Sequence, residues 1–154
     1  MTDAASAASV TGGPIALASD HAGFALKEAL KPALAKWGVK FEDLGTHSEA
    51  STDYPDYARA LATRVAAGQF PLGILVCGTG LGMAMAANRH KGVRAAPCSD
   101  PYAARMTRQH NDANVLCLGS RIVGAGLAED IVKAFLEATF EGGRHSGRVA
   151  KIEL

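Results

Sequence analysis

Five short apolar runs alternate with five longer helical patterns along the chain, and this alternation limits the possible folds more than any other feature. The apolar runs, which are the predicted strands, lie at 15–19, 39–44, 72–77, 93–98 and 114–119. The helical patterns cover 23–37, 55–67, 82–89, 101–110 and 125–140. Strands that alternate with helices form right-handed βαβ units, with a parallel sheet between two helical layers. The sequence therefore predicts an α/β fold, a Rossmann-like three-layer α-β-α sandwich around a five-stranded parallel sheet.

Proline positions refine the predicted helices. Pro55 and Pro101 suit the first turn of a helix, where a missing N–H costs nothing. Pro32 falls inside the first helical pattern, so a kink or a break is expected near Lys31.

The two ends of the chain are predicted to lie outside the core. Residues 1–13 are rich in Ala, Ser, Thr and Gly and lack the basic start and apolar middle of a secretory signal, so we expect a disordered extension. Residues 14–154 are expected to form a single domain, because this length suits one core. Residues 141–154, EGGRHSGRVAKIEL, are expected to form a polar tail that is too basic for the core.

Charge, hydropathy and cysteine content exclude several classes of protein. The formal net charge is +1, so no strong field favours nucleic acid or a membrane surface, and no apolar run approaches the ~20 residues of a membrane span. The three cysteines are odd in number and include no CxxC pair, which argues against a disulfide framework or a structural zinc site. This usage favours a reducing cytoplasm. Cys98 and Cys117 are expected to be buried as small hydrophobic residues.

Polar and glycine residues collect directly after the predicted strands. They lie at 20–23, 45–47, 78–82, 99–100 and 120–121. In an open parallel sheet, ligands bind beyond the carboxyl ends of the strands, near the point where the strand order reverses. We therefore expect a ligand site at this edge of the sheet.

The third predicted strand ends in a cysteine that opens a glycine-rich loop, CGTGLG. The glycine spacing does not fit the GxGxxG dinucleotide fingerprint and no P-loop is present, so nucleotide binding is disfavoured. The backbone N–H groups of such a loop could instead hold an oxyanion that exists only during a reaction. The same dipoles would favour a thiolate at Cys77, acting as a nucleophile or as a base. The alternative, a cysteine that only closes a buried strand, is equally open.

Two further clusters carry acid–base chemistry. Asp20 and His21 could transfer protons or bind a sugar hydroxyl, or they could cap a helix beside an exposed histidine. His110 could be a general acid or base, or a cation favoured by a helix C-terminus.

Arginines offer phosphate binding, because the guanidinium group forms charge-assisted pairs of hydrogen bonds with phosphate oxygens. The candidates are Arg121, Arg144 and Arg148. The alternative is a solvated basic tail. The remaining histidines have no spacing that marks a metal site and receive no role; they are His47, His90 and His145.

Taken together, these segments resemble the type-B ribose-5-phosphate isomerase family, which also includes galactose-6-phosphate isomerase. The resemblance runs from residue 15 to about residue 148 and is carried by ASDHAGFALK, DLGTHS with TDYPDYA, GILVCGTGLGMAMAAN, SDPYAARMTRQHNDANVLCLGSRIVG and FEGGRHSGR. It implies an aldose–ketose isomerase of the pentose phosphate pathway that needs no metal and no cofactor. After ring opening, a proton would move between C2 and C1 of ribose 5-phosphate through a cis-enediolate, giving ribulose 5-phosphate.

The resemblance also implies a role for each residue that matches the family's motifs. Cys77 would be the base, His110 would assist ring opening as an acid, and Asp20 and Thr79 would share the proton chemistry. The loop that would supply N–H groups to the enediolate comprises Gly78, Thr79, Gly80, Leu81 and Gly82. Other substrate-binding residues would be Asp20, His21, Tyr54, Asn111, Arg121, Arg144 and Arg148, of which the arginines would bind the phosphate.

The family has branches, and the resemblance leaves some alternatives open. One branch carries a glutamate base where this chain has Met83, which cannot take a proton, so the cysteine branch is indicated. The family pocket lies at a subunit interface, which implies a homodimer with shared active sites that can pair into a tetramer. The alternative substrates are 6-phosphohexoses, allose 6-phosphate or galactose 6-phosphate. A more distant alternative is a non-catalytic nucleotide- or phosphate-binding module.

Overall fold

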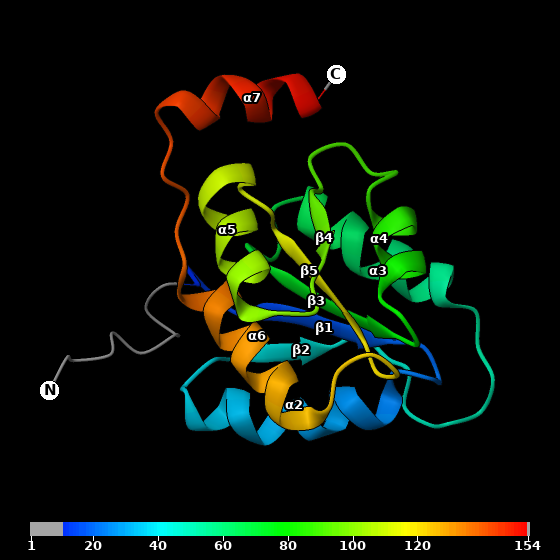
Figure 1. The fold of residues 1–154 in the computed structure, drawn as a ribbon. Helices are drawn as coiled ribbons and strands as arrows, with labels where there is room; N and C mark the ends of the chain where they lie inside the picture. The colour runs from blue at the N-terminus through cyan, green and yellow to red at the C-terminus, as the bar shows by residue number, and fades with distance from the viewer. Residues whose placement is uncertain (1–10, 154) are drawn as a thin grey trace, which may run out of the picture.

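The computed structural model describes residues 11–153, in which a five-stranded sheet lies between two layers of helices (Figure 1). The strands are β1 (Ile15–Ser19), β2 (Phe41–Asp43), β3 (Gly73–Cys77), β4 (Ala95–Pro97) and β5 (Val115–Gly119). The helices are α2 (Phe24–Lys36), α3 (Tyr54–Ala66), α4 (Leu81–Ala87), α5 (Pro101–Asn111), α6 (Ala125–Glu137) and α7 (Arg144–Ile152). The order is β2-β1-β3-β5-β4 with every pair parallel, so the predicted fold class is confirmed.

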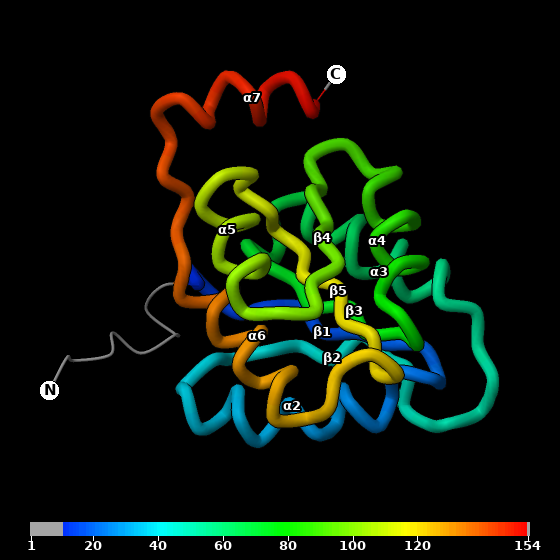
Figure 2. Tube along the Cα trace, viewed as in Figure 1, coloured from blue at the N-terminus to red at the C-terminus, as the bar shows by residue number. Residues whose placement is uncertain are grey.

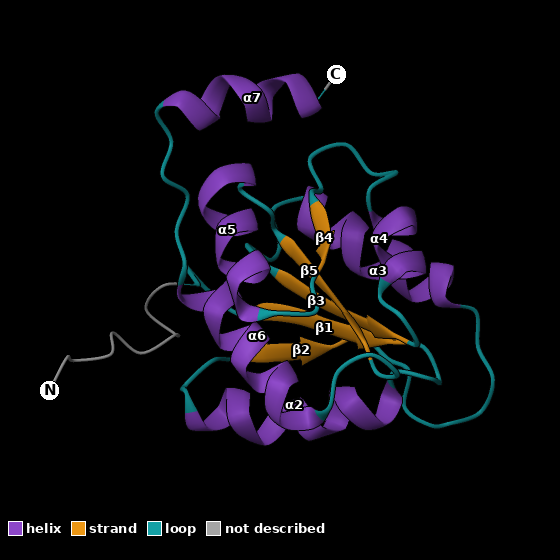
Figure 3. Cartoon of the chain, viewed as in Figure 1, coloured by secondary structure: helices purple, strands orange, loops and turns teal. Residues whose placement is uncertain are grey.

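The core is divided between the two faces of the sheet. One face packs against α2, α5 and α6, and the other packs against α3 and α4, as Figures 1 and 3 show. Side chains of the three central strands alternate between these faces, so Val76 joins the first core and Cys77 joins the second. Because both faces are covered, β1, β3 and β5 are buried along their whole length, which explains their unbroken apolar sequence.

The edge strands are shorter than the sequence predicts. β2 and β4 each have three residues, whereas the apolar runs there have six. An edge strand pairs on one side only, so its apolar flanks continue as loops that pack on the core without entering the ladder. Val39, in one such flank, is buried outside the strand.

The break expected near Lys31 is wrong. α2 runs without interruption from Phe24 to Lys36 and contains Pro32. Pro32 is exposed on the solvent side of the helix, where water can bond to the backbone carbonyl that lost its partner. The opposite side buries Leu30 and Leu34, and this packing keeps the helix continuous.

The polar tail expected after residue 140 lies outside the core, as predicted, but most of it is helical. Residues Arg144–Ile152 form α7, which lies beyond α5 at the end of an extended segment (Figures 1 and 2). The end of α7 is held by Glu153, which pairs with Arg94 at 2.6 Å and accepts a hydrogen bond from the N–H of Gly92 at 3.0 Å. These contacts join residues about sixty positions apart, so local composition could not reveal them.

The N-terminal extension expected at 1–13 falls mostly outside the described residues. Within the described part, Thr11 is buried and its hydroxyl donates a hydrogen bond to the carbonyl of Gly13 at 2.9 Å. Among the helices of the described chain, none combines the length and the apolar character that crossing a membrane requires.

Candidate active site

A cavity of about 220 Å³ opens at the carboxyl ends of β1 and β3. The chain leaves β1 toward β2 on one side and returns to β3 on the other, so this is the point where the strand order reverses. The side chains and backbone around the cavity come from three strand ends, from the first residue of α3 and from the first turn of α4. They are Asp20, His21, Ala22, Tyr54, Cys77, Gly78, Thr79, Gly82 and Arg121.

Cys77 closes β3 at the base of this cavity and is 4% exposed. The loop turns back over it at Gly80, which adopts the left-handed conformation with a φ of 79°. This turn brings the N–H of Gly80 within 3.1 Å of the Cys77 sulfur, to which it donates. A backbone donor at this distance favours negative charge on the sulfur. The structure therefore gives Cys77 a partner suited to a thiolate, which a cysteine that only fills space would not need.

The same loop presents unused donors. No described residue accepts a hydrogen bond from the N–H of Gly78 or Thr79, and the N–H of Leu81 meets only the Thr79 hydroxyl, at 3.3 Å. Gly80 and Leu81 do not line the cavity: Gly80 is buried against the backbone of Leu118, and Leu81 faces a neighbouring cavity of about 220 Å³ that Thr79 also lines. Three of the five predicted loop residues, Gly78, Thr79 and Gly82, therefore line the cavity, and Gly80 and Leu81 do not.

Close contacts explain why glycine occurs at alternate positions of the loop. A Cβ at Gly78 would lie 3.2 Å from the Arg121 guanidinium, and one at Gly82 would lie 2.8 Å from the Tyr54 ring. Across the sheet edge, a Cβ at Gly119 would lie 2.6 Å from the Thr79 backbone. Small residues here let Arg121 and Tyr54 form the wall of the cavity.

Asp20 and His21 form the opposite wall. Asp20 is buried and accepts a hydrogen bond from the N–H of Gly23 at 3.0 Å, ahead of α2. Both backbone groups of Thr52 meet His21 Nδ1, the N–H at 3.1 Å and the carbonyl at 3.2 Å. Nδ1 is therefore occupied by the loop in either tautomer, and Nε2 is the nitrogen left for the cavity.

The loop after β5 completes the wall that holds Arg121. The Ser120 hydroxyl donates to the Ala22 carbonyl at 2.8 Å, which ties this loop to the one after β1. The N–H of Arg121 donates to the Gly78 carbonyl at 3.0 Å. The backbone of Arg121 is thus fixed to the glycine loop, and its guanidinium lies where a substrate anion can reach it.

Four predicted site residues lie elsewhere on the chain. α5 begins just beyond the carboxyl end of β4 and is about 16 Å long, so it ends near the amino edge of the sheet. His110 and Asn111 are in its last turn, and Arg144 and Arg148 are on α7. One chain therefore does not bring these four residues to the Cys77 cavity.

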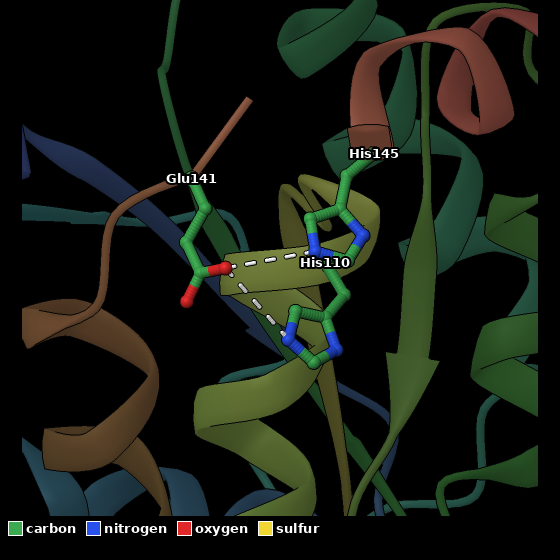
Figure 4. Close-up of side chains that lie close together, drawn as sticks. All are labelled: His110, Glu141 and His145. Carbon is green, nitrogen blue, oxygen red and sulfur yellow. Dashed lines mark ion pairs between the residues drawn. The ribbon is translucent and has the colours of Figure 1, made fainter. Parts of the chain in front are cut away.

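His110 belongs to a separate cluster with Glu141 and His145 (Figure 4). The two imidazole rings stack with centroids 4.3 Å apart, and both Nε2 atoms face Glu141 Oε2, at 4.0 Å from His110 and 3.5 Å from His145. Burial lowers the pKa of His145, and the nearby His110 and Arg144 lower it further. The sequence analysis gave His145 and Glu141 no role, because only the fold of α7 brings them to His110.

A larger cavity of about 470 Å³ lies between α7, α5 and β4, and Asn111 is in its lining. Its other polar lining residues are Asn88, Arg89, His90, Lys91, Arg94, Thr107 and Glu153. Among the described residues, neither a cysteine nor the glycine loop lines this larger cavity.

The other two cysteines are unsuited to act as a base. Cys98 and Cys117 are buried, as predicted. Burial and the nearby Asp100 raise the pKa of Cys98 to about 11, and burial raises the pKa of Cys117 well above its ordinary value. Met83 is fully buried in α4. Of the three cysteines, Cys77 alone both lines a cavity and accepts a hydrogen bond from a backbone N–H of the described residues.

Comparisons with known proteins show the family to which the chain belongs. Residues 15–152 match the family described as Ribose/Galactose Isomerase. Ribose-5-phosphate isomerase B of Escherichia coli (strain K12) is 52% identical over 138 residues, which cover 90% of this chain and 93% of that protein. A solved ribose 5-phosphate isomerase from Thermotoga maritima has a TM-score of 0.89 and 52% identity, and the match covers 92% of this chain and 97% of that one. Ribose-5-phosphate isomerase B from Mycoplasma genitalium, solved with bound ribulose-5-phosphate, has a TM-score of 0.87 and 45% identity, with 92% and 95% covered.

Proposed function

Because the chain belongs to the ribose/galactose isomerase family, it interconverts ribose 5-phosphate and ribulose 5-phosphate, and we propose that it does so with Cys77 as the base. The observation that carries the assignment is the 3.1 Å contact from the Gly80 N–H to the Cys77 sulfur at the base of the cavity. This contact supports the proposal because it directs a backbone donor at the sulfur beside the cavity.

The reaction follows from this geometry. The Cys77 thiolate takes the proton from C2 of the open-chain aldose, and the electron pair of that bond forms the C1–C2 double bond of a cis-enediolate, with the charge on O1. The proton of the O2 hydroxyl then moves to O1, the thiol returns its proton to C1, and O2 becomes the carbonyl oxygen of the ketose. No atom is gained or lost.

The glycine loop stabilises the charge that appears on O1. The unused N–H groups of Gly78 and Thr79 and the Thr79 hydroxyl are the donors available beside Cys77. Each donor aimed at a developing oxyanion contributes roughly 3–4 kcal/mol to lowering the barrier. Two donors would therefore account for a large part of the acceleration.

The walls of the cavity hold the sugar. Asp20 and His21 bind its hydroxyl groups, His21 through Nε2, and Tyr54 packs on its face. Arg121 binds the phosphate from the opposite side, beside Gly78. Holding the remote phosphate keeps the open chain aligned with Cys77, which reduces the entropic part of the barrier.

A second copy of the chain supplies the rest of the site. We assign ring opening to His110, sugar binding to Asn111, and further phosphate binding to Arg144 and Arg148, all contributed by the partner of a homodimer that can pair into a tetramer. The support is their position: they lie on the last turn of α5 and on α7, away from the cavity of their own chain.

The proposal extends to the domain and the compartment. Residues 14–154 act as one isomerase domain, because a single sheet takes strands from residues 15 to 119 and α7 contacts α5. The three cysteines are free, which fits the reducing cytoplasm.

The test is a comparison of two cysteine variants. Cys77→Ala should lower kcat/KM for ribose 5-phosphate by roughly 10²–10⁴-fold, the usual contribution of a general base. Cys98→Ala removes a buried thiol outside the active cavity and should keep the wild-type rate. Turnover of the Cys77 variant at the wild-type rate would eliminate the base assignment. Assays with allose 6-phosphate and galactose 6-phosphate, run in parallel, rank the substrates.

A further inference from the structure

Glu141 and His145, to which the proposed reaction gives no role, lie beside His110. The three ligand atoms of this cluster, two imidazole nitrogens and one carboxylate oxygen, all lie within 4.8 Å of one another (Figure 4). Two imidazoles and one carboxylate are a common ligand set for zinc, and borderline metals of the first transition row prefer such donors.

We propose that His110, Glu141 and His145 bind a divalent transition metal ion, zinc above all, through the two Nε2 atoms and a carboxylate oxygen of Glu141. Three protein ligands leave a fourth position for water. The site is separate from the Cys77 cavity of the same chain.

The backbone brings the three residues together before any ion arrives. The N–H of Glu141 donates to the carbonyl of Gln109 at 3.0 Å, which fixes the segment before α7 to the last turn of α5. The N–H of His145 donates to the Gly142 carbonyl at 3.0 Å, which sets the first turn of α7. The ligands therefore come from two elements that are already joined, and binding requires little ordering of the chain.

The buried histidine points to a ligand independently. The side chain of His145 is 7% exposed, and its Nε2 forms no hydrogen bond with any described residue, although Glu141 Oε2 lies 3.5 Å away. A buried polar atom without a hydrogen bond is costly. Coordination to a metal would satisfy this nitrogen.

Closing the site requires the His110 ring to turn, because two stacked, nearly parallel imidazole planes cannot both direct an in-plane lone pair at one ion. Tetrahedral ligands at the usual zinc distances lie roughly 3.3 Å apart. His145 is already 3.5 Å from Glu141 Oε2, and His110 is 4.0 Å from it. The His110 and Glu141 side chains are 38% and 51% exposed, so both can rotate toward the fixed His145.

The charged side chains near the cluster limit its affinity for a metal ion. Arg144 and Arg148 lie on the same helix as His145 and oppose a cation, whereas Glu141 supplies a negative charge. The carboxylate is therefore the ligand on which binding depends most, and an uncharged amide at position 141 should not replace it.

The experiment measures binding of the metal alone to the full chain after chelator treatment and dialysis. Calorimetry with zinc should give one ion per chain, and cobalt should give visible d–d absorption without a thiolate charge-transfer band. Glu141→Gln and His145→Ala should each weaken zinc binding by roughly 100-fold, since even changes beyond the ligands cost about 10–100-fold. His47→Ala, which removes an exposed imidazole outside the cluster, should bind as the wild type does.

Several results would overturn the site. They are no saturable zinc binding by the wild type, equal binding by the wild type and the Glu141→Gln variant, or a charge-transfer band that shows a cysteine ligand. Glu141 is exposed, so its variant keeps the fold, and circular dichroism checks the His145 variant.

One consequence rests on the proposed function. A metal on His110 occupies the nitrogen that ring opening requires, so zinc should inhibit the wild type and spare the Glu141→Gln variant. Zinc that binds at the cluster without inhibiting would overturn the role of His110 and leave the metal site standing.

Discussion

The neighbouring atoms determine which residue types fit at single positions around the active cavity. Gly82 and Gly119 illustrate two cases, because an added Cβ would meet the Tyr54 ring in one and the Thr79 backbone in the other. An aromatic ring that is 41% exposed can move aside, whereas a loop backbone held by neighbouring hydrogen bonds cannot. The same alanine substitution should therefore have different effects at the two positions.

Gly82→Ala should leave the free energy of unfolding nearly unchanged and raise KM, because it displaces Tyr54 from the cavity wall. Gly119→Ala should cost about 1–3 kcal/mol of stability, as expected of overpacking against rigid neighbours. Urea unfolding and steady-state kinetics on both variants measure these effects. Gly126→Ala, which meets nothing within 4 Å, is the control: it should leave KM unchanged and should not lower stability, since alanine is favoured over glycine in a helix. Equal unfolding midpoints for the Gly82 and Gly119 variants would contradict this assignment.

At the scale of the element, a buried charge fastens α2 to the loop after β2. Lys27 is fully buried, and its Nζ lies 2.6 Å from Asp43 and 2.7 Å from the Thr46 carbonyl. Lys31 reaches the same Asp43 oxygen at 2.7 Å. Burial alone would raise the pKa of Asp43, but hydrogen bonds from Lys27, Lys31 and the Gly45 N–H outweigh it and hold the pKa below its ordinary value.

Replacing Asp43 should lower the free energy of unfolding more than replacing Lys27. Asp43→Asn leaves the Lys27 ammonium without its main counter-charge and should cost about 3–5 kcal/mol. Lys27→Met leaves Asp43 paired with Lys31 and mainly removes the donor to Thr46, a loss of about 1–3 kcal/mol. Chemical denaturation measures both, with the exposed Lys36→Met as a control expected to stay within about 0.5 kcal/mol. A Lys27 variant less stable than the Asp43 variant would contradict this order.

Acid should remove the contribution of Asp43. Its pKa is lowered in the folded state, so the stabilisation is complete above the unfolded value of about 3.9 and is lost as the pH falls through the lower, folded pKa. Unfolding of the wild type should therefore become easier below about pH 4, and the Asp43→Asn variant should show a flatter pH dependence there. Parallel curves for the two proteins would show that Asp43 contributes nothing in this range.

The elements also show what the sequence could and could not predict. Apolar runs and strand ends located the five strands and most of the cavity residues, because burial on both faces and turn chemistry are local properties, whereas Tyr54 was predicted only from the family resemblance. α7 was missed because its sequence is mostly polar and its position depends on Arg94, Glu153 and the stack of His145 on His110. The cluster with Glu141 was missed for the same reason. The tie from Thr52 to His21 Nδ1 spans 31 residues and left no local signal.

At the scale of the whole molecule, the proposed catalytic groups fall into two sets. One set surrounds Cys77 at the carboxyl edge of the sheet, and the other lies on the last turn of α5 and on α7 (Figure 1). The helix α5 separates them within one chain by its full length. A homodimer that places the second set of one copy over the first set of the other would complete two equal sites.

Mixing two inactive variants tests this arrangement. Dimers of Cys77→Ala with His110→Ala contain one intact site and one doubly defective site, so random re-association should restore up to about a quarter of the wild-type activity. Mixing Cys77→Ala with Asp20→Asn should restore none, because both residues belong to the cavity of the same chain. Activity assays after dissociation and re-association measure the difference. Equal recovery in the two mixtures would contradict a shared site.

The close contacts at the glycines also bear on how this site can evolve. At Gly78 and Gly82 the obstructing atoms belong to Arg121 and Tyr54, so a second change at those partners could accommodate a larger residue. At Gly119 the obstruction is the backbone of Thr79, which no exchange of side chains removes. A search for compensating mutations should therefore recover suppressors of the first two alanine variants at their partner positions and none at Thr79 for the third. Substitutions at Arg121 and Tyr54 can therefore change the substrate preference, while the backbone of the loop over Cys77 keeps its conformation.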